Sequence, residues 1–458
     1  MTRGLLLQLP AELLSEIVSH LDKVPRKARC FEDVQETVLD AIQYRRDLRN
    51  LLLTCSTLYR ITAPIYYGKV FIDFDQFEHN GPRSMSRKMR LWSQDPVASL
   101  IKKHARELSV DMQDHILQRF HLLYDFVSSL PKLQALFVRG QFQGVHAHLE
   151  WEQILSCQTI RRLHITSFDT EVVYHRTTVD FMNRLSGCLK NHPVLDELRF
   201  TWEPVPDIYT HILHYNISGH GSPKLGGNDI PFRTRSLIIE GWSLGSDYLK
   251  VSPTDLKRLK IVAALTSTTD DGFWQALGTN NTHLTALDCN KPSKAMIKYL
   301  ASYRGLEELR LSGVRSTDSN SFNPIDALSI HQGSLKILDM AKCEDIGDQW
   351  TVGIDSGRHL LSAILDCRYL ETMSIPTWAS PKELIELVDT CVKLPKLQKL
   401  ALTSNVDRGG ISPQAFQRVI RNTGLRELTL SGIEMDYSLG CADGWPVVYE
   451  ISVIRDRP

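Results

Sequence analysis

Apolar residues recur from about residue 105 onward in the spacing apolar-x-x-apolar-x-apolar. Clear copies, with leucine at the first two positions, begin at Leu133, Leu195, Leu256, Leu284, Leu306, Leu335, Leu397 and Leu425. Looser copies begin at Ala105, Ile160, Thr234, Leu370 and Val448. Because side chains alternate along a strand, each copy predicts a short β-strand with one buried face. The mean distance between starts is about 29 residues, which indicates a repeat architecture.

Some copies are similar enough to be internal repeats. Residues 305–313 and 424–432 share seven of nine amino acids, and a second pair shares six of seven. Between copies, apolar residues follow helical spacing, most clearly over 381–391 behind a Ser-Pro pair. We therefore expect an α/β fold over 105–458, a curved leucine-rich-repeat solenoid whose strands line the concave side.

The first seventy residues follow a different pattern. Leu13 and Ile17 fall four residues apart behind a Leu-Pro pair, which predicts an amphipathic helix with Pro in its first turn. A charged insertion, residues 22–47, separates this helix from a second apolar helical stretch, which Pro64 is expected to end. The expected organisation is an all-α domain at 5–70, a connecting segment at 71–104 and the repeat domain at 105–458.

The order of these features resembles that of F-box/leucine-rich-repeat proteins, which are numerous in filamentous fungi. The strings Leu-Pro-Ala-Glu-Leu-Leu at 9–14 and Pro-Ile-Tyr-Tyr at 64–67, with the second helix between them, carry the resemblance. It implies an F-box that docks onto the adaptor subunit of an SCF-type (cullin-RING) ubiquitin ligase, and through it onto a cullin. The insertion 22–47 is longer than is usual in that family. The adaptor-binding residues that the resemblance implies are Leu9, Pro10, Leu13, Leu14, Ile17, Leu51, Cys55 and Leu58.

In such proteins the repeats bind the target protein. Side chains between the leucines of each strand are expected on the concave surface, since strand side chains alternate. That surface is either the recognition site or an ordinary solvated face. Its mixed signs, with a basic excess in the middle, favour an acidic or phosphorylated target segment. The expected substrate-binding residues are Arg162, His164, Glu197, Arg199, Arg258, Lys260, Asp288, Glu308, Arg310 and Asp339.

Charge and cysteine content limit the kinds of partner and the cellular compartment that we expect for this protein. The 53 basic residues balance the 53 acidic ones, which gives no electrostatic reason to expect nucleic acid or an anionic membrane as partner. The nine cysteines contain no Cys-x-x-Cys pair, which favours reduced thiols and a cytoplasmic or nuclear location. We expect neither a signal peptide nor a membrane span.

Two motifs suggest chemistry, and neither has the neighbours that its chemistry needs. The Gly-x-Ser-x-Gly motif around Ser243 matches a nucleophile elbow, but Pro253 and the next strand leave little room for the helix that must follow. His211, His214 and His220 have no Cys or carboxylate nearby at ligand spacing. We therefore expect no catalytic residue, no metal and no cofactor.

These observations lead to three hypotheses of different kinds. The first is a non-enzymatic substrate-recognition subunit of an SCF-type ubiquitin ligase. The alternative is a leucine-rich-repeat interaction scaffold that acts independently of ubiquitination. The third, which the sequence supports least, is a hydrolase with Ser243 as nucleophile.

Overall fold

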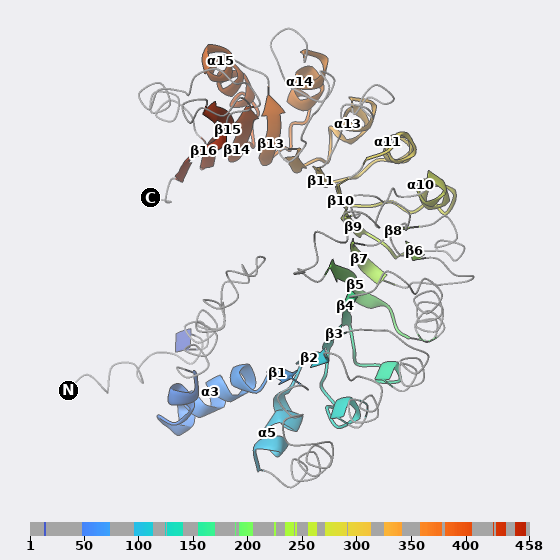
Figure 1. Ribbon diagram of the computed structural model, residues 1–458, viewed down its shortest axis with the longest axis vertical. Coiled ribbons are helices and arrows are strands. Elements are labelled where there is room, and N and C mark those ends of the chain that lie inside the picture. Colours follow the sequence, from blue (N-terminus) through green and yellow to red (C-terminus); the bar gives the residue numbers. More distant parts are fainter. Residues whose placement is uncertain are drawn as a thin grey trace, which may run out of the picture. The chain divides into compact units, whose positions relative to one another are not determined.

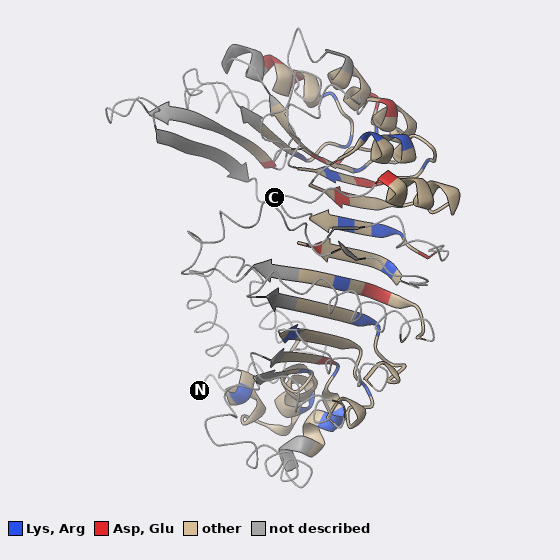
Figure 2. Ribbon diagram, turned by 45° about the vertical axis from the view of Figure 1, so that its right-hand side comes forward, with Lys and Arg blue, Asp and Glu red and all other residues tan. Residues whose placement is uncertain are grey.

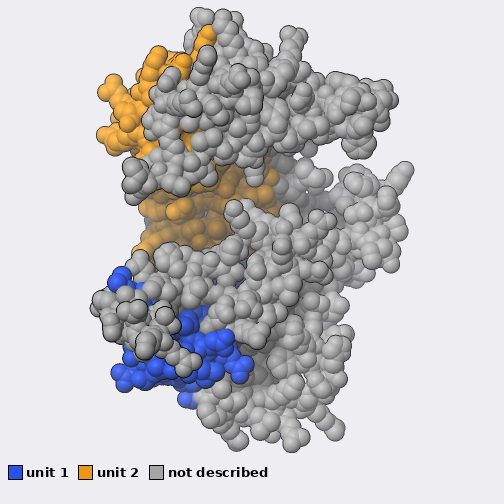
Figure 3. Space-filling view, turned by 90° about the vertical axis from the view of Figure 1, so that its left-hand side faces the viewer, with its two compact units in different colours: residues 1–171, 203–205 blue, residues 172–202, 206–458 orange. Residues whose placement is uncertain are grey.

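A computed structural model provides the structure of the protein, and the chain divides into two compact units (Figure 3). Unit 1 comprises residues 1–171 and 203–205, and unit 2 comprises residues 172–202 and 206–458. The structure describes residues 13–14, 48–73, 96–112, 124, 126–140, 154–169, 188, 192–204, 224–225, 234–241, 243–244, 255–262, 271–290, 292–312, 325–340, 358–377, 381–404, 425, 427–436 and 445–454. The predicted boundaries at 70 and 104 stay predictions.

Helix α3, Ser56–Tyr66, is the main described helix before the first strand of unit 1. Cys55 caps its start, because the thiol accepts a hydrogen bond from the Leu58 N–H at 3.5 Å. The expectation that Pro64 ends the helix was wrong, since α3 continues to Tyr66. Proline removes one hydrogen bond, the one to the carbonyl of Arg60 four residues earlier. Arg60 is exposed, so water can satisfy that carbonyl.

The sheet of unit 1 consists of parallel strands in the order β1-β2-β3-β4. A helix precedes β2 inside the segment that the sequence predicted as a connection. In the sheet, the apolar strand positions Leu108, Leu136 and Leu163 are each 0% exposed, as the repeat pattern predicts. The elements are β1 (Lys69–Asp73), α5 (Pro96–His104), β2 (Glu107–Met112), β3 (Ala135–Gly140) and β4 (Arg162–Asp169).

Unit 2 continues the same repeat pattern in a longer parallel sheet, with the order β5-β7-β9-β10-β11-β12-β13-β14-β15. Its strands are β5 (Leu195–Pro204), β7 (Thr234–Glu240), β9 (Arg258–Val262), β10 (Ala286–Cys289), β11 (Glu308–Leu311), β12 (Ile337–Asp339), β13 (Thr372–Thr377), β14 (Lys399–Ser404) and β15 (Glu427–Asp436). A separate pair, β6 (Lys224–Leu225) and β8 (Ser243–Leu244), forms a small parallel sheet.

Helices cover one face of the unit 2 sheet, and its consecutive strands follow an arc with these helices on the outer side (Figure 1). They are α10 (Asp271–Thr279), α11 (Lys294–Leu300), α13 (Ile325–His331), α14 (Arg358–Leu365) and α15 (Pro381–Cys391). The helix expected over 381–391 is thereby confirmed. This is the open α/β repeat architecture that the spacing predicts.

The leucine positions of successive copies form a continuous buried row. Leu259, Leu287, Leu309 and Leu338 are paired in register across β9 to β12, and each is at most 2% exposed. Full burial of one leucine side chain contributes roughly 1.5–3 kcal/mol. The row explains why the copies share a spacing although their other residues differ.

The last looser copy departs from the pattern. Strand β16, Trp445–Ile454, pairs antiparallel with β15, whereas the copy at Val448 predicted another parallel repeat. Only residues 437–444 lie between the two strands. A parallel crossover needs about a dozen residues or more, so a connection of this length permits only a hairpin.

Candidate recognition surface

The face of the unit 2 sheet opposite the helices carries a row of polar residues, and we call it the open face. Side chains alternate in β9, where Leu259 and Ile261 are buried while Arg258 and Lys260 lie on the open face. Blue and red segments both occur along the middle strands in Figure 2. One row in register consists of Ile238, Lys260, Asp288, Arg310 and Asp339.

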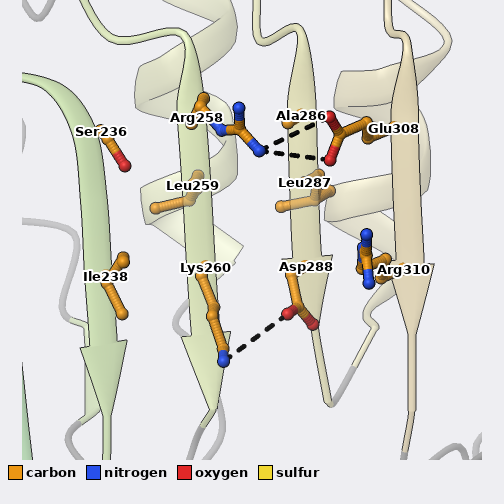
Figure 4. A pocket seen from close by; sticks show the side chains of 10 residues that line it. All are labelled: Ser236, Ile238, Arg258, Leu259, Lys260, Ala286, Leu287, Asp288, Glu308 and Arg310. Atoms are coloured by element: carbon orange, nitrogen blue, oxygen red, sulfur yellow. Dashed lines mark hydrogen bonds and ion pairs between the residues drawn. The ribbon is translucent and has the colours of Figure 1, made fainter. Parts of the chain in front are cut away.

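A shallow depression of about 210 Å³ lies on the open face over β7 to β11 (Figure 4). In one row across it, Ala286 lies between the charged residues Arg258 and Glu308. In the next row, three charged residues lie side by side, namely Lys260, Asp288 and Arg310. It is lined by Ser236, Ile238, Arg258, Leu259, Lys260, Ala286, Leu287, Asp288, Glu308 and Arg310. Five of the predicted substrate-binding residues thus come together at one place.

Ion pairs cross-link this part of the face, and Glu240 is their centre. Its carboxylate accepts from Arg199 at 2.5 Å and lies 3.0 Å from the Lys260 ammonium. Lys260 in turn lies 3.8 Å from Asp288. Arg258 donates to Glu308 at 3.3 Å across Ala286, the small residue between their strands (Figure 4).

The pKa values of the two central carboxylates move in opposite directions. Burial by itself would raise the pKa of Glu240, but hydrogen bonds and charges from Arg199 and Lys260 outweigh it, so this pKa is lowered. Burial raises the pKa of Asp288, because Lys260 and Arg310 only partly offset it and Asp339 and Glu240 repel its charge. Of these two carboxylates, Glu240 is therefore the more firmly ionised partner of the basic side chains.

The basic excess expected from the sequence is absent from this face. From β5 to β12 its basic residues are Arg199, Arg258, Lys260 and Arg310, and its acidic residues are Glu197, Glu240, Asp288, Glu308 and Asp339. Three of the four basic side chains are held in ion pairs with carboxylates, and Arg310 lies between Asp288 and Asp339 in register. The open face is a mutually neutralised ladder, which does not favour an acidic ligand.

The remaining predicted substrate-binding residues lie on the sheet of unit 1. Arg162 donates to Glu107 at 2.6 Å, and the pair spans Ala135, which lies between their strands in register. The ring of His164 meets Phe137 edge to face, with centroids 4.5 Å apart. Both residues follow the alternation that the sequence predicts, and their role in binding stays a prediction.

Sequence reasoning missed Glu107 and Glu240, which hold the two shortest of these ion pairs. Both lie in looser copies, which begin at Ala105 and Thr234. These copies lack the leucine at their first position, so it is harder to see from the sequence which of their residues face the same side as in the strict copies. If the looser copies are aligned with the strict ones, Glu107 lies beside Ala135 of the next strand. Glu240 then lies one position after the last apolar residue of its copy. The strand register was therefore the signal that could have found them.

The predicted adaptor-binding residues differ in exposure. Leu13 is 46% exposed, whereas Leu14 and Leu58 are buried at 2% and 3%. Leu51 and Cys55 are half-buried. Leu9, Pro10 and Ile17 lie outside the described residues, so their contacts stay predictions.

Large exposed apolar side chains in the described part of the chain concentrate near its start. They are Leu13 at 46%, Leu53 at 77% and Tyr59 at 37%, together with Tyr369 at 46% in unit 2. The Lys396 ammonium lies 4.2 Å from the centroid of the Tyr369 ring, which partly covers it. Apart from Tyr369, the exposed large apolar side chains of the described residues therefore fall within the first sixty residues.

The structure gives little support to the motifs that suggested catalysis or metal binding. Ser243 lies in β8, where it pairs in register with Lys224 of β6. The described residues contain no group of three or more His, Cys, Asp or Glu side chains that could hold a metal ion. His211, His214 and His220 lie outside these residues. A search of the same residues found no helix long and apolar enough to cross a bilayer.

Comparison with known proteins gives few matches. No family model matches the chain, and no curated protein matches its sequence. Among solved structures, the chain is similar to one from the crystal structure of the Rad7 and Elc1 complex in yeast. The identity is 11% and the TM-score 0.36, over 69% of this chain and 75% of that chain. So low a score gives no ground for transferring a partner or an activity.

Proposed function

We propose that this protein is a non-enzymatic substrate-recognition subunit of an SCF-type ubiquitin ligase. In this role the N-terminal helices dock onto the adaptor subunit and the repeats bind a target protein. The repeat-built sheet supports a role in protein interaction, because it offers many exposed polar side chains on a rigid frame. The ligase would supply all catalysis.

The observation that carries the adaptor contact is the exposure of Leu13, Leu53 and Tyr59. Exposed apolar side chains of this size are candidates for burial by a partner, and these three lie in the part of the sequence that the adaptor contact would use. Burial of one leucine at an interface contributes roughly 1.5–3 kcal/mol, which corresponds to about ten-fold or more in affinity. A few such residues suffice for a stable complex.

A pull-down with recombinant adaptor subunit tests the proposal. The wild-type chain should bind, and Leu13→Asp combined with Leu53→Asp should weaken binding at least ten-fold, since a buried carboxylate adds a desolvation cost to the lost contact. Tyr369→Asp is the matched control, because it changes an equally exposed apolar residue in unit 2. It should bind like wild type.

Two outcomes would contradict the ligase role. If the wild-type chain fails to bind the adaptor, the interaction scaffold independent of ubiquitination becomes the better hypothesis. If both variants bind like wild type, the exposed apolar residues are not the docking surface.

A further inference from the structure

A second depression, of about 410 Å³, lies in unit 1 where β2, β3 and β4 begin. Its lining includes three basic residues and no acidic one, unlike the open face of unit 2. The lining residues are Arg106, Pro131, Lys132, Gln134, Thr159 and Arg161. All six are exposed, so the depression is accessible to a partner.

The backbone holds two of these basic residues at equivalent positions. The N–H groups of Gln134 and Ala135 both donate to the Arg106 carbonyl, at 2.8 and 2.9 Å. The Arg161 N–H donates to the Gln134 carbonyl at 2.7 Å in the same way. Neighbouring strands lie about 4.8 Å apart, which places the Arg106 and Arg161 backbones about 10 Å from each other. Their long side chains can reach one bound segment from both sides.

The positive charges of this depression are not offset nearby. Within the part of the chain that the structure describes, no carboxylate pairs with Arg106, Lys132 or Arg161. The pKa of His104 is lowered, first by burial and then by the charges of Lys103, Lys132 and Arg106. A protonated histidine is disfavoured there partly because the surrounding potential is positive.

At the same strand position in unit 2, some basic residues are neutralised by a neighbouring carboxylate. Arg235 occupies it on β7 and pairs with Asp196 at 3.4 Å. Lys336 occupies it before β12 and pairs with Glu307 at 2.8 Å. Lys257 occupies it before β9 and is exposed, with no ion pair among the described residues. A single unpaired cation at this position is therefore ordinary, and what distinguishes unit 1 is that Arg106, Arg161 and the nearby Lys132 line one depression.

We propose that Arg106, Lys132 and Arg161 form a binding site for an acidic segment of a partner protein, whose aspartate or glutamate side chains pair with the three cations. Three separated cations match several separated carboxylates better than a single phosphate group. Alternate side chains of an extended segment lie roughly 6.7 Å apart, so long side chains from backbones about 10 Å apart can reach two of them. Arginine also pairs with carboxylates in a bidentate geometry.

A nucleic acid fits the observations less well. The site is only three strands wide, and the chain as a whole has 53 basic and 53 acidic residues, so no extended basic track is indicated. The inference rests on the proposed role in protein interaction and adds the chemistry of the partner.

Fluorescence anisotropy on the full chain tests the site with a labelled peptide of three glutamates alternating with glycines. We expect it to bind more tightly than its glutamine counterpart. Arg106→Gln combined with Arg161→Gln should weaken binding roughly three- to ten-fold, because each exposed ion pair contributes modestly. The matched control, Arg235→Gln combined with Lys257→Gln, removes the same charge at the same strand position in unit 2. It should change binding by less than about two-fold.

Several outcomes would overturn the acidic-segment site. These are equal binding of the glutamine peptide, an equal loss in both double variants, or tighter binding of a phosphoserine peptide or a single-stranded oligonucleotide. The altered side chains are exposed, so folding should be retained, and thermal unfolding checks this. Lys132→Gln alone provides a second variant, which we also expect to weaken binding of the glutamate peptide. Adaptor binding measured on the same proteins separates failure of this inference from failure of the ligase proposal.

Discussion

At the scale of single residues, His331 shows how a polar side chain joins successive repeats. It is 1% exposed, its Nδ1 accepts the Leu306 N–H at 3.3 Å, and its Nε2 lies 2.9 Å from the Leu300 carbonyl. This arrangement requires a neutral ring with the proton on Nε2, which donates to Leu300. Burial lowers the pKa of His331, although the hydrogen bond to Leu300 acts in the opposite direction.

The lowered pKa of His331 makes the free energy of unfolding depend on pH in a definite direction. The unfolded chain takes up a proton near the usual pKa of about 6.5, and the folded chain does so only at lower pH. The contribution of the neutral ring is therefore complete above that value and is lost as the pH falls below it. His331→Gln should reduce the free energy of unfolding by roughly 1–3 kcal/mol at pH 7.5 and flatten its fall between pH 7.5 and 5.5. Urea unfolding at both pH values measures this, with the exposed His283→Gln as control, and an unchanged pH dependence would refute it.

At the scale of elements, the strands were predictable where leucine holds the repeat phase. Leu259, Leu287 and Leu309 lie in the buried row that their spacing predicts, and α15 follows its apolar periodicity. The end of α3 and the direction of β16 were not predictable in the same way, because they depend on solvation of one carbonyl and on the length of one connection. The pairing of charges depends on register between strands, which a single copy does not contain.

Glu240 provides the test of the ion-pair ladder at this scale. Glu240→Gln would leave Arg199 and Lys260 without their shared carboxylate, and both are partly buried. We expect a loss of about 1–2 kcal/mol in the free energy of unfolding at pH 7. Glu308→Gln is the matched control, since its partner Arg258 is more exposed and the pair should contribute less than about 1 kcal/mol. Chemical denaturation compares the two variants, and equal losses would contradict a central role for Glu240.

At the scale of the whole molecule, the last strand of a long sheet built from repeats is the place where another copy of the chain can pair most easily. An unpaired parallel strand presents N–H and C=O groups that can pair with another copy of the chain. Strand β16 covers β15 through ten residue pairs, from Glu427 with Ile454 to Asp436 with Trp445. β16 is then the outermost strand in the order of the sheet, and we expect this antiparallel hairpin to act as a terminal cap, as the end repeats of solenoids commonly do.

Removal of this cap should convert the protein from a dispersed to a self-associating state. A chain that ends at residue 436 lacks β16 and exposes β15, so we expect larger species and loss of material at micromolar concentration. A chain that ends at residue 454 retains every pair of the hairpin and is the control. Size-exclusion chromatography with light scattering distinguishes the two. If the shorter chain elutes at the same molar mass per particle as the control and stays in solution, β16 is not the element that protects the edge of the sheet.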